Sequence, residues 1–127
     1  DKSLLKAQAL ARAGVLVAPA SFKNATLEEL RSVCNGCGAS GSWFRPPATK
    51  WGTVIVYACH IHDWMYNFGK VIEDKEEADR TMRNNIQRLI RRDNKWWKPT
   101  LLQMVRSQLY YVSVDWFGGD AYWKGKN

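Results

Sequence analysis

Apolar residues recur at helical spacing over most of the chain. Residues 2–13 are helix formers with their leucines on one side, and Gly14 follows as a stop. Thr26 followed by Glu29 forms a capping box, which predicts a second helix beginning at Thr26. Between residues 35 and 47 glycines and two prolines interrupt the pattern, so an irregular loop is expected there.

Two longer helices are predicted in the middle of the chain. The first follows apolar residues at steps of four and three from Val54 to Phe68, and Gly69 ends it. The second begins near Asp74, where acidic residues suit the positive end of a helix, and its apolar stripe reaches Ile90. Their short connection makes them antiparallel neighbours. Pro99 opens a last predicted helix, which ends before Gly118 and Gly119. The expected fold is therefore all-α, in a single domain spanning residues 1–127.

Composition and charge narrow the class of protein. Hydrophobic residues make up 46% of the 127 residues, which is typical of a globular chain. No apolar run approaches the roughly 20 residues of a membrane-spanning helix. Residues 13–20 lack the layout of a signal peptide. A net charge of +7 favours an anionic partner, either nucleic acid or an anionic membrane surface.

The residues that carry chemistry are concentrated in the two long helices. His62 and Tyr66 are four apart and lie on one helical face. Asp79 lies on the buried side of the next helix, where a carboxylate requires a partner. A carboxylate bonded to one ring nitrogen fixes the tautomer of His62 and leaves the other nitrogen to accept a proton. The alternative is a His–Asp pair that only joins two helices.

Asp63 and the preceding loop suggest a metal site. Asp63 directly follows His62, and the loop before the helix is rich in glycine. Glycines expose backbone carbonyls, which together with a carboxylate suit a hard cation such as calcium. Amides of the same loop can stabilise an oxyanion. These features favour a catalytic interpretation of the His–Asp pair.

The stretch Cys59-His60-Ile61-His62-Asp63-Trp64-Met65-Tyr66 resembles the C-x-x-H-D-x-x-Y signature of secreted phospholipases A2. The loop at residues 35–41 is similar to their calcium loop. Ala78-Asp79-Arg80 is similar to the stretch that holds the carboxylate orienting the catalytic histidine. The resemblance covers roughly residues 35–90. The small number of cysteines is more similar to bacterial, fungal or viral relatives than to the animal enzymes.

The resemblance implies a fold and a set of roles. It implies a core of two long antiparallel helices, a calcium-binding loop before them and flanking helices. His62 would activate the water that attacks the sn-2 ester of a glycerophospholipid, Asp79 would orient His62, and Tyr66 would bond to Asp79. The Gly38 amide and Ca²⁺ would stabilise the oxyanion. The implied calcium ligands are Asp63, Asn35, Gly36, Gly38 and Ser40. The resemblance also implies a Cys37–Cys59 disulfide, whereas Cys34 has no obvious partner.

Two other functions compete with this one. Cys34-x-x-Cys37 and Cys59-x-x-His62 have the paired spacing of a structural zinc site, which with the positive charge suggests a nucleic-acid-binding module. That interpretation leaves Asp63, Tyr66 and Asp79 unexplained. The second alternative is a catalytically inactive, cationic membrane-binding protein on the phospholipase scaffold.

The expected partner is a phospholipid bilayer surface, with anionic lipid favoured and no nucleic acid, and the expected location is secreted or at a membrane surface. Interleaved basic and aromatic residues suggest the docking face. They are Arg91, Arg92, Lys95, Trp96 and Trp97. A solvated helix face is the alternative explanation for the same charges. Because His62 must be neutral to accept a proton, activity is expected to rise with pH across its titration.

Overall fold

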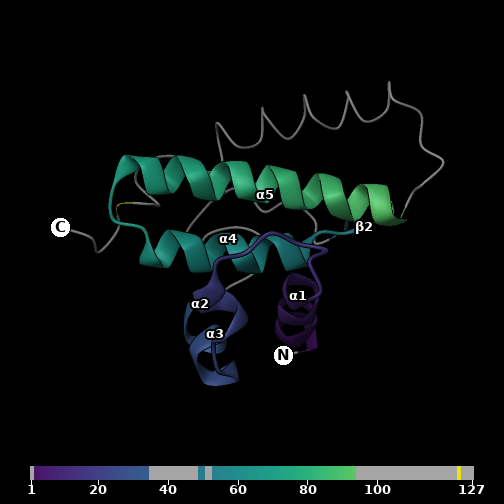
Figure 1. Cartoon of the computed structure of the whole chain (residues 1–127), viewed down its shortest axis with the longest axis horizontal. Helices are drawn as coiled ribbons and strands as arrows, with labels where there is room; N and C mark the ends of the chain where they lie inside the picture. Colours follow the sequence, from purple (N-terminus) through teal and green to yellow (C-terminus); the bar gives the residue numbers. More distant parts are fainter. Residues whose placement is uncertain (1, 35–48, 51–52, 94–122, 124–127) are drawn as a thin grey trace.

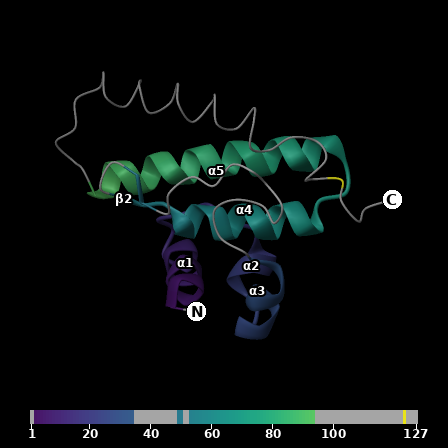
Figure 2. The same cartoon turned by 180° about the vertical axis from the view of Figure 1, so that it is seen from behind.

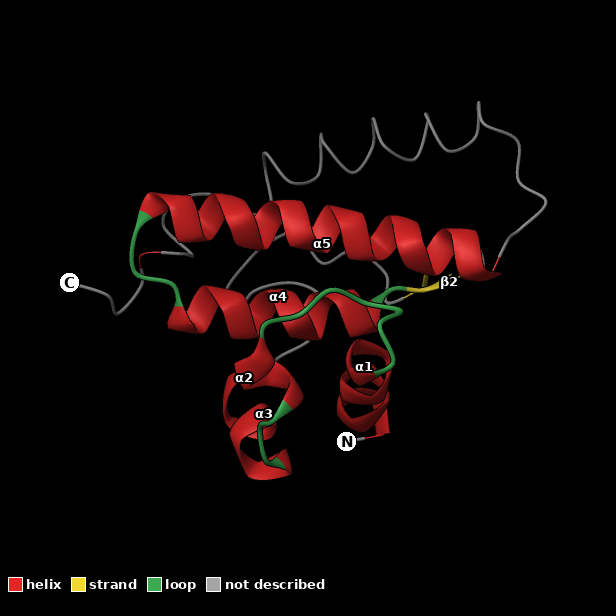
Figure 3. Cartoon of the chain, in the orientation of Figure 1, coloured by secondary structure: helices red, strands yellow, loops and turns green. Residues whose placement is uncertain are grey.

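The structure is a computed structural model that describes residues 2–34, 49–50, 53–93 and 123. Helices make up most of these residues (Figure 3). In chain order the elements are α1 (Lys2–Arg12), α2 (Ala20–Lys23), α3 (Leu27–Val33), β1 (Thr49–Lys50), β2 (Thr53–Val54), α4 (Val56–Phe68) and α5 (Ile72–Asp93). The all-α class is therefore confirmed for the described residues.

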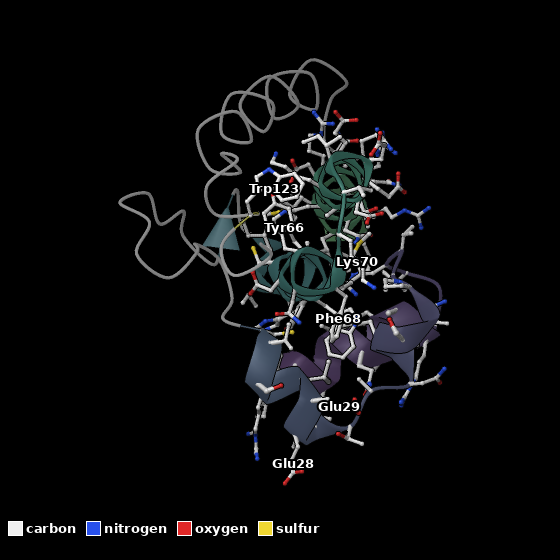
Figure 4. All side chains as sticks on the ribbon, turned by 90° about the vertical axis from the view of Figure 1, so that its left-hand side faces the viewer. Glu28, Glu29, Tyr66, Phe68, Lys70 and Trp123 are labelled. Carbon is white, nitrogen blue, oxygen red and sulfur yellow. The ribbon has the colours of Figure 1, made fainter. Side chains whose placement is uncertain are left out.

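Two long antiparallel helices form the centre of the molecule. Figure 1 shows α4 and α5 side by side and joined by a short turn, and Figure 2 shows the same pairing from behind. Helices α1, α2 and α3 lie against the other side of α4. Figure 4, seen from the turn, places Tyr66 on the side of α4 toward α5 and Phe68 on the side toward the N-terminal helices. Helix α4 is thus covered on two sides, which explains why so many of its residues are buried.

The first helix ends in the way the sequence predicted. Gly14 has a φ of 81°, a left-handed conformation that glycine adopts without a steric penalty. The Val15 amide donates to the Leu10 carbonyl and the Gly14 amide to the Ala11 carbonyl, which are the two bonds of a Schellman motif. These bonds satisfy the last carbonyls of α1 and turn the chain back toward α2.

The second predicted helix is α3, and its capping box is present. The Thr26 side chain accepts from the Glu29 amide, and the Glu29 carboxylate accepts from the Thr26 amide. Helix α2 was not predicted, because four residues are too few to show a helical period. The short antiparallel pair of β1 and β2 was not predicted either.

The boundaries of the long helices differ from the expectation by two residues. Val54 belongs to β2, so α4 begins at Val56 rather than Val54, and it ends at Phe68 before Gly69 as predicted. Helix α5 begins at Ile72 rather than Asp74. The reason is that Asp74 already lies inside the first turn, from which its carboxylate accepts the Lys70 and Val71 amides at 2.8 and 3.3 Å.

Buried polar side chains fasten the N-terminal segments to the long helices. Asn85 is fully buried on α5; its amide nitrogen donates to the Val17 carbonyl at 2.8 Å and its oxygen accepts the Val17 amide at 2.7 Å. Gln8 on α1 donates to the carbonyls of Phe22 and Ala25. Trp64 on α4 donates to the Ser21 hydroxyl. Together these bonds fix α2 and the linkers on either side of it.

None of the described helices combines the length and the apolar character needed to cross a membrane. Several predictions fall outside the described residues and stay predictions. They concern the loop residues Asn35, Gly36, Gly38 and Ser40, the cysteine Cys37, the docking residues Lys95, Trp96 and Trp97, and the helix expected after Pro99.

Candidate active site

His62 and Asp79 meet between the two long helices. The Nε2 atom of His62 lies 2.9 Å from Oδ1 of Asp79. The Tyr66 hydroxyl donates to the same oxygen at 2.9 Å, and the rings of His62 and Tyr66 stack with centroids 4.0 Å apart. Residue 62 is 5% exposed and the Asp79 side chain 13%. This is the contact that the helical spacing predicted, brought about by one turn of α4 facing α5.

Lys75 is a member of this cluster that the sequence analysis missed. Its ammonium donates to Oδ2 of Asp79 at 2.9 Å, and its side chain is only 15% exposed. The signal was present in the sequence, because residues four apart on a helix are neighbours. It was overlooked because the apolar stripe of α5 starts only at Ala78.

The donors around Asp79 determine the tautomer of His62. Lys75 and Tyr66 can only donate to the carboxylate, and an ionised carboxylate can only accept. Nε2 of His62 must therefore carry the proton of the His62–Asp79 bond, so that Nδ1 holds the ring's lone pair. Burial lowers the pKa of His62 below its ordinary value; the bond to Asp79 opposes this, and the charge of Lys75 adds to it. His62 is therefore neutral near pH 7.

Asp63 follows His62 on α4 and is partly buried. Its charge reaches Cys34, the residue at the end of α3 that leads into the predicted calcium loop. Among the described residues, no group of three His, Cys, Asp or Glu side chains could hold a metal. The predicted site uses one carboxylate and loop oxygens, and of these ligands the structure describes only Asp63. The calcium ligand set therefore stays a prediction.

The cysteines differ in state. Cys34 is a buried free thiol that donates to the His60 carbonyl at 3.3 Å. Burial raises the pKa of Cys34 to about 12, with a further contribution from Asp63. Cys59, buried on α4, is disulfide-bonded. Cys37 lies outside the described residues, so the Cys37–Cys59 pairing stays a prediction.

The second histidine of α4 lies apart from this site. His60 is 5% exposed, and its Nε2 atom is 2.9 Å from the Ser3 hydroxyl of α1. Its buried Nδ1 atom has no hydrogen-bond partner among the residues that the structure describes. Burial lowers the pKa of His60 to about 4. His60 therefore belongs to the packing of α1 on α4.

The predicted docking residues are only partly described. Arg91 and Arg92 are exposed in the last turn of α5. Their position is about 18 Å along the helix from Asp79, at 1.5 Å per residue. Comparison of the chain with protein-family models, with curated proteins and with solved structures finds no match.

Proposed function

We propose that this protein hydrolyses the sn-2 ester of glycerophospholipids in a calcium-dependent reaction. The observation that carries the proposal is the buried His62–Asp79 pair, with Tyr66 on the same carboxylate oxygen. Asp63 stands next to His62 in the sequence, at the place where the resemblance to phospholipases A2 puts a calcium ligand. A pair that served only to join α4 and α5 would not require this second carboxylate.

His62 has the protonation state and the orientation of a general base. It is neutral near pH 7, and its Nε2–H donates to Asp79. Its Nδ1 atom would take a proton from the water that attacks the ester carbonyl. Asp79 would then stabilise the imidazolium, while Tyr66 holds the shared carboxylate oxygen in place. The proton would later pass from Nδ1 to the leaving alkoxide.

The metal part of the proposal rests on Asp63 and the loop before α4. Asp63 would hold calcium through its carboxylate, joined by oxygens of Asn35, Gly36, Gly38 and Ser40. Bound calcium would supply a positive charge next to the ester carbonyl. The Gly38 amide would donate to the oxyanion that develops from this carbonyl during the attack.

The zinc interpretation fits the described contacts less well. Zinc binds cysteine as the thiolate, but Cys34 is a buried thiol whose pKa is raised to about 12. Cys59 is disulfide-bonded and so lacks a thiolate. The two cysteines of the Cys–His pattern that the structure describes are thus in states that do not favour zinc.

The first experiment is fatty-acid release from mixed phospholipid vesicles, with calcium or with a chelator. We expect release by the wild type that stops on chelation. His62→Gln should reduce the rate at least 100-fold, since a general base contributes about 10²- to 10⁴-fold. Asp63→Asn should raise the calcium concentration needed for half-maximal activity. Glu76→Gln, an exposed carboxylate on α5, is the matched control and should leave both quantities unchanged.

Other outcomes would contradict this proposal or support one of the two alternative functions. Release that continues in chelator, or in His62→Gln, would contradict the proposed function. Vesicle binding without any release would support the inactive membrane-binding protein. Stoichiometric zinc in the purified protein, lost together with its fold on chelation, would support the zinc site.

A further inference from the structure

Lys75 occupies a position that helix energetics alone do not favour. It lies in the first turn of α5, where the helix dipole favours anions and disfavours cations. It also precedes its acidic partner by four residues, which is the weaker order for such a pair on a helix. A lysine here therefore has to be explained by its contact with Asp79.

The contact differs from an ordinary surface ion pair. The side chains of Lys75 and Asp79 are 15% and 13% exposed, whereas those of Arg80 and Glu77 on the same helix are each 57% exposed. Exposed pairs are screened by water and contribute little, while a buried charge-assisted bond restricts both groups. The Lys75–Asp79 bond is thus able to fix the carboxylate.

The division of donors on Asp79 shows what the bond does. Oδ1 accepts from His62 and Tyr66, and Oδ2 accepts from Lys75. A carboxylate held at one oxygen can still rotate about its Cβ–Cγ bond. Holding Oδ2 separately keeps Oδ1 directed at α4. The ammonium also offsets the charge of a carboxylate that would otherwise be buried with two neutral donors.

We propose that Lys75 is a positioning residue of the site, which holds the Asp79 carboxylate in one orientation so that His62 stays in the Nε2–H tautomer. Besides Lys75, the charged or titratable groups of the described residues near His62 include Tyr66 on its own helix and Asp79 on α5, and Asp63 follows His62 in the sequence. Lys75 does not act on the substrate. Its catalytic consequence rests on the proposed function, but its effect on the tautomer does not.

The catalytic consequence is tested with Lys75→Met, which keeps the apolar stem and removes the ammonium. We expect kcat to fall roughly 10- to 100-fold, the usual effect of losing a partner that orients a functional group. KM and the calcium dependence should stay as in the wild type. Lys75→Arg should recover most of kcat. Arg80→Met, which breaks the exposed pair on the same helix, is the control and should behave as wild type.

The tautomer is tested without reference to activity. The chain has two histidines, so ¹⁵N-labelled imidazole spectra can be assigned with a His60→Gln variant. We expect one tautomer of His62, protonated at Nε2, in the wild type and in Lys75→Arg, and a mixture in Lys75→Met. An unchanged single tautomer in Lys75→Met would overturn the proposal, whatever the activity. If the wild type releases no fatty acid, the proposed function fails, and these spectra alone decide the role of Lys75.

A Lys75 variant that fails to fold must be distinguished from a folded variant in which only the Asp79 carboxylate has lost its orientation. Far-UV circular dichroism and thermal unfolding should show Lys75→Met to be folded. If it is not, Lys75→Gln retains a donor without the charge and replaces it in both experiments. A tautomer mixture in folded Lys75→Gln would support the role of the charge, and a wild-type spectrum would overturn it.

Discussion

His60 and His62 are two residues apart and have opposite surroundings. Two helical positions differ by about 200°, so one ring points toward α1 and the other toward α5. His62 has a carboxylate partner, while Nδ1 of His60 is buried without a hydrogen-bond partner in the described part of the chain. A buried histidine without an acidic partner is unfavourable in its protonated form. His60 should therefore control stability in mild acid.

We expect the free energy of unfolding to fall as the pH drops from about 6.5 toward 4. The folded pKa of His60 is about 4 and the unfolded value 6.5, so the unfolded chain binds the extra proton across this window. The loss should total on the order of 3 kcal/mol. His60→Gln should flatten this dependence. Urea unfolding of both proteins at several pH values measures it.

The comparison isolates His60 because other titrating groups contribute to both proteins equally. These include His62, whose pKa is also lowered and whose contribution has the same sign. Stability curves of wild type and His60→Gln that run parallel between pH 6.5 and 4 would contradict the expectation.

At the scale of elements, local signals predicted the helices that carry their own start or stop. Gly14 ended α1, the Thr26–Glu29 box began α3, and Gly69 followed α4. The elements that the sequence pattern did not predict depend on tertiary contacts. Helix α2 is too short for periodicity, and it is held by the bonds that Gln8 and Trp64 make to residues around it.

The two hydrogen bonds between the Asn85 side chain and the Val17 backbone could not be predicted from the sequence pattern either. Asn85 is a polar residue beside the apolar stripe of α5, and nothing local indicates that it pairs with a backbone 68 residues away. Both bonds satisfy backbone groups that would otherwise be unpaired. These two hydrogen bonds should therefore contribute strongly to stability.

We expect Asn85→Ala to lower the free energy of unfolding by about 2–4 kcal/mol. The substitution leaves the Val17 amide and carbonyl without these partners and opens a small cavity. Asn84→Ala, at an exposed position next to it, is the matched control and should change stability by about 0.5 kcal/mol or less. Denaturant unfolding compares the two. Equal losses of unfolding free energy in both variants would show that the Asn85–Val17 hydrogen bonds do not stabilise the fold.

At the scale of the whole molecule, charge is divided along α5. The first two turns carry Glu73, Asp74, Glu76 and Glu77, and the last turn carries Arg91 and Arg92. The acidic end stands beside the turn that joins α4 to α5, and the basic end is at the far end of the helix. Docking on anionic lipid should therefore use the basic end.

We expect binding to anionic vesicles to weaken about 10- to 30-fold when Arg91 and Arg92 are both replaced by Gln. Each basic residue near an anionic surface contributes about 1 kcal/mol. Changing the exposed Lys2 and Lys6 of α1 to Gln removes the same charge elsewhere and should have a smaller effect. Vesicle co-sedimentation at two salt concentrations measures this. Equal losses in the two double variants would indicate that only net charge matters.

The sequence anticipated the centre of the candidate site better than its periphery. His62, Tyr66 and Asp79 were predicted to meet because helical spacing and the cost of a buried carboxylate leave few arrangements. Lys75 was missed because it precedes Ala78, where the apolar stripe of α5 starts, although its spacing of four from Asp79 was visible in the sequence. The calcium ligands of the loop remain predictions, since backbone oxygens have no signature of residue type.

Val17 lies in the linker between α1 and α2, and the residue is 40% exposed. Its amide nevertheless donates to a fully buried side chain of α5, 2.7 Å away. That amide can exchange its hydrogen for deuterium only when α5 separates from the linker. Exchange at Val17 should then be as slow as in the core helices. A single surface position would report how often the whole molecule opens.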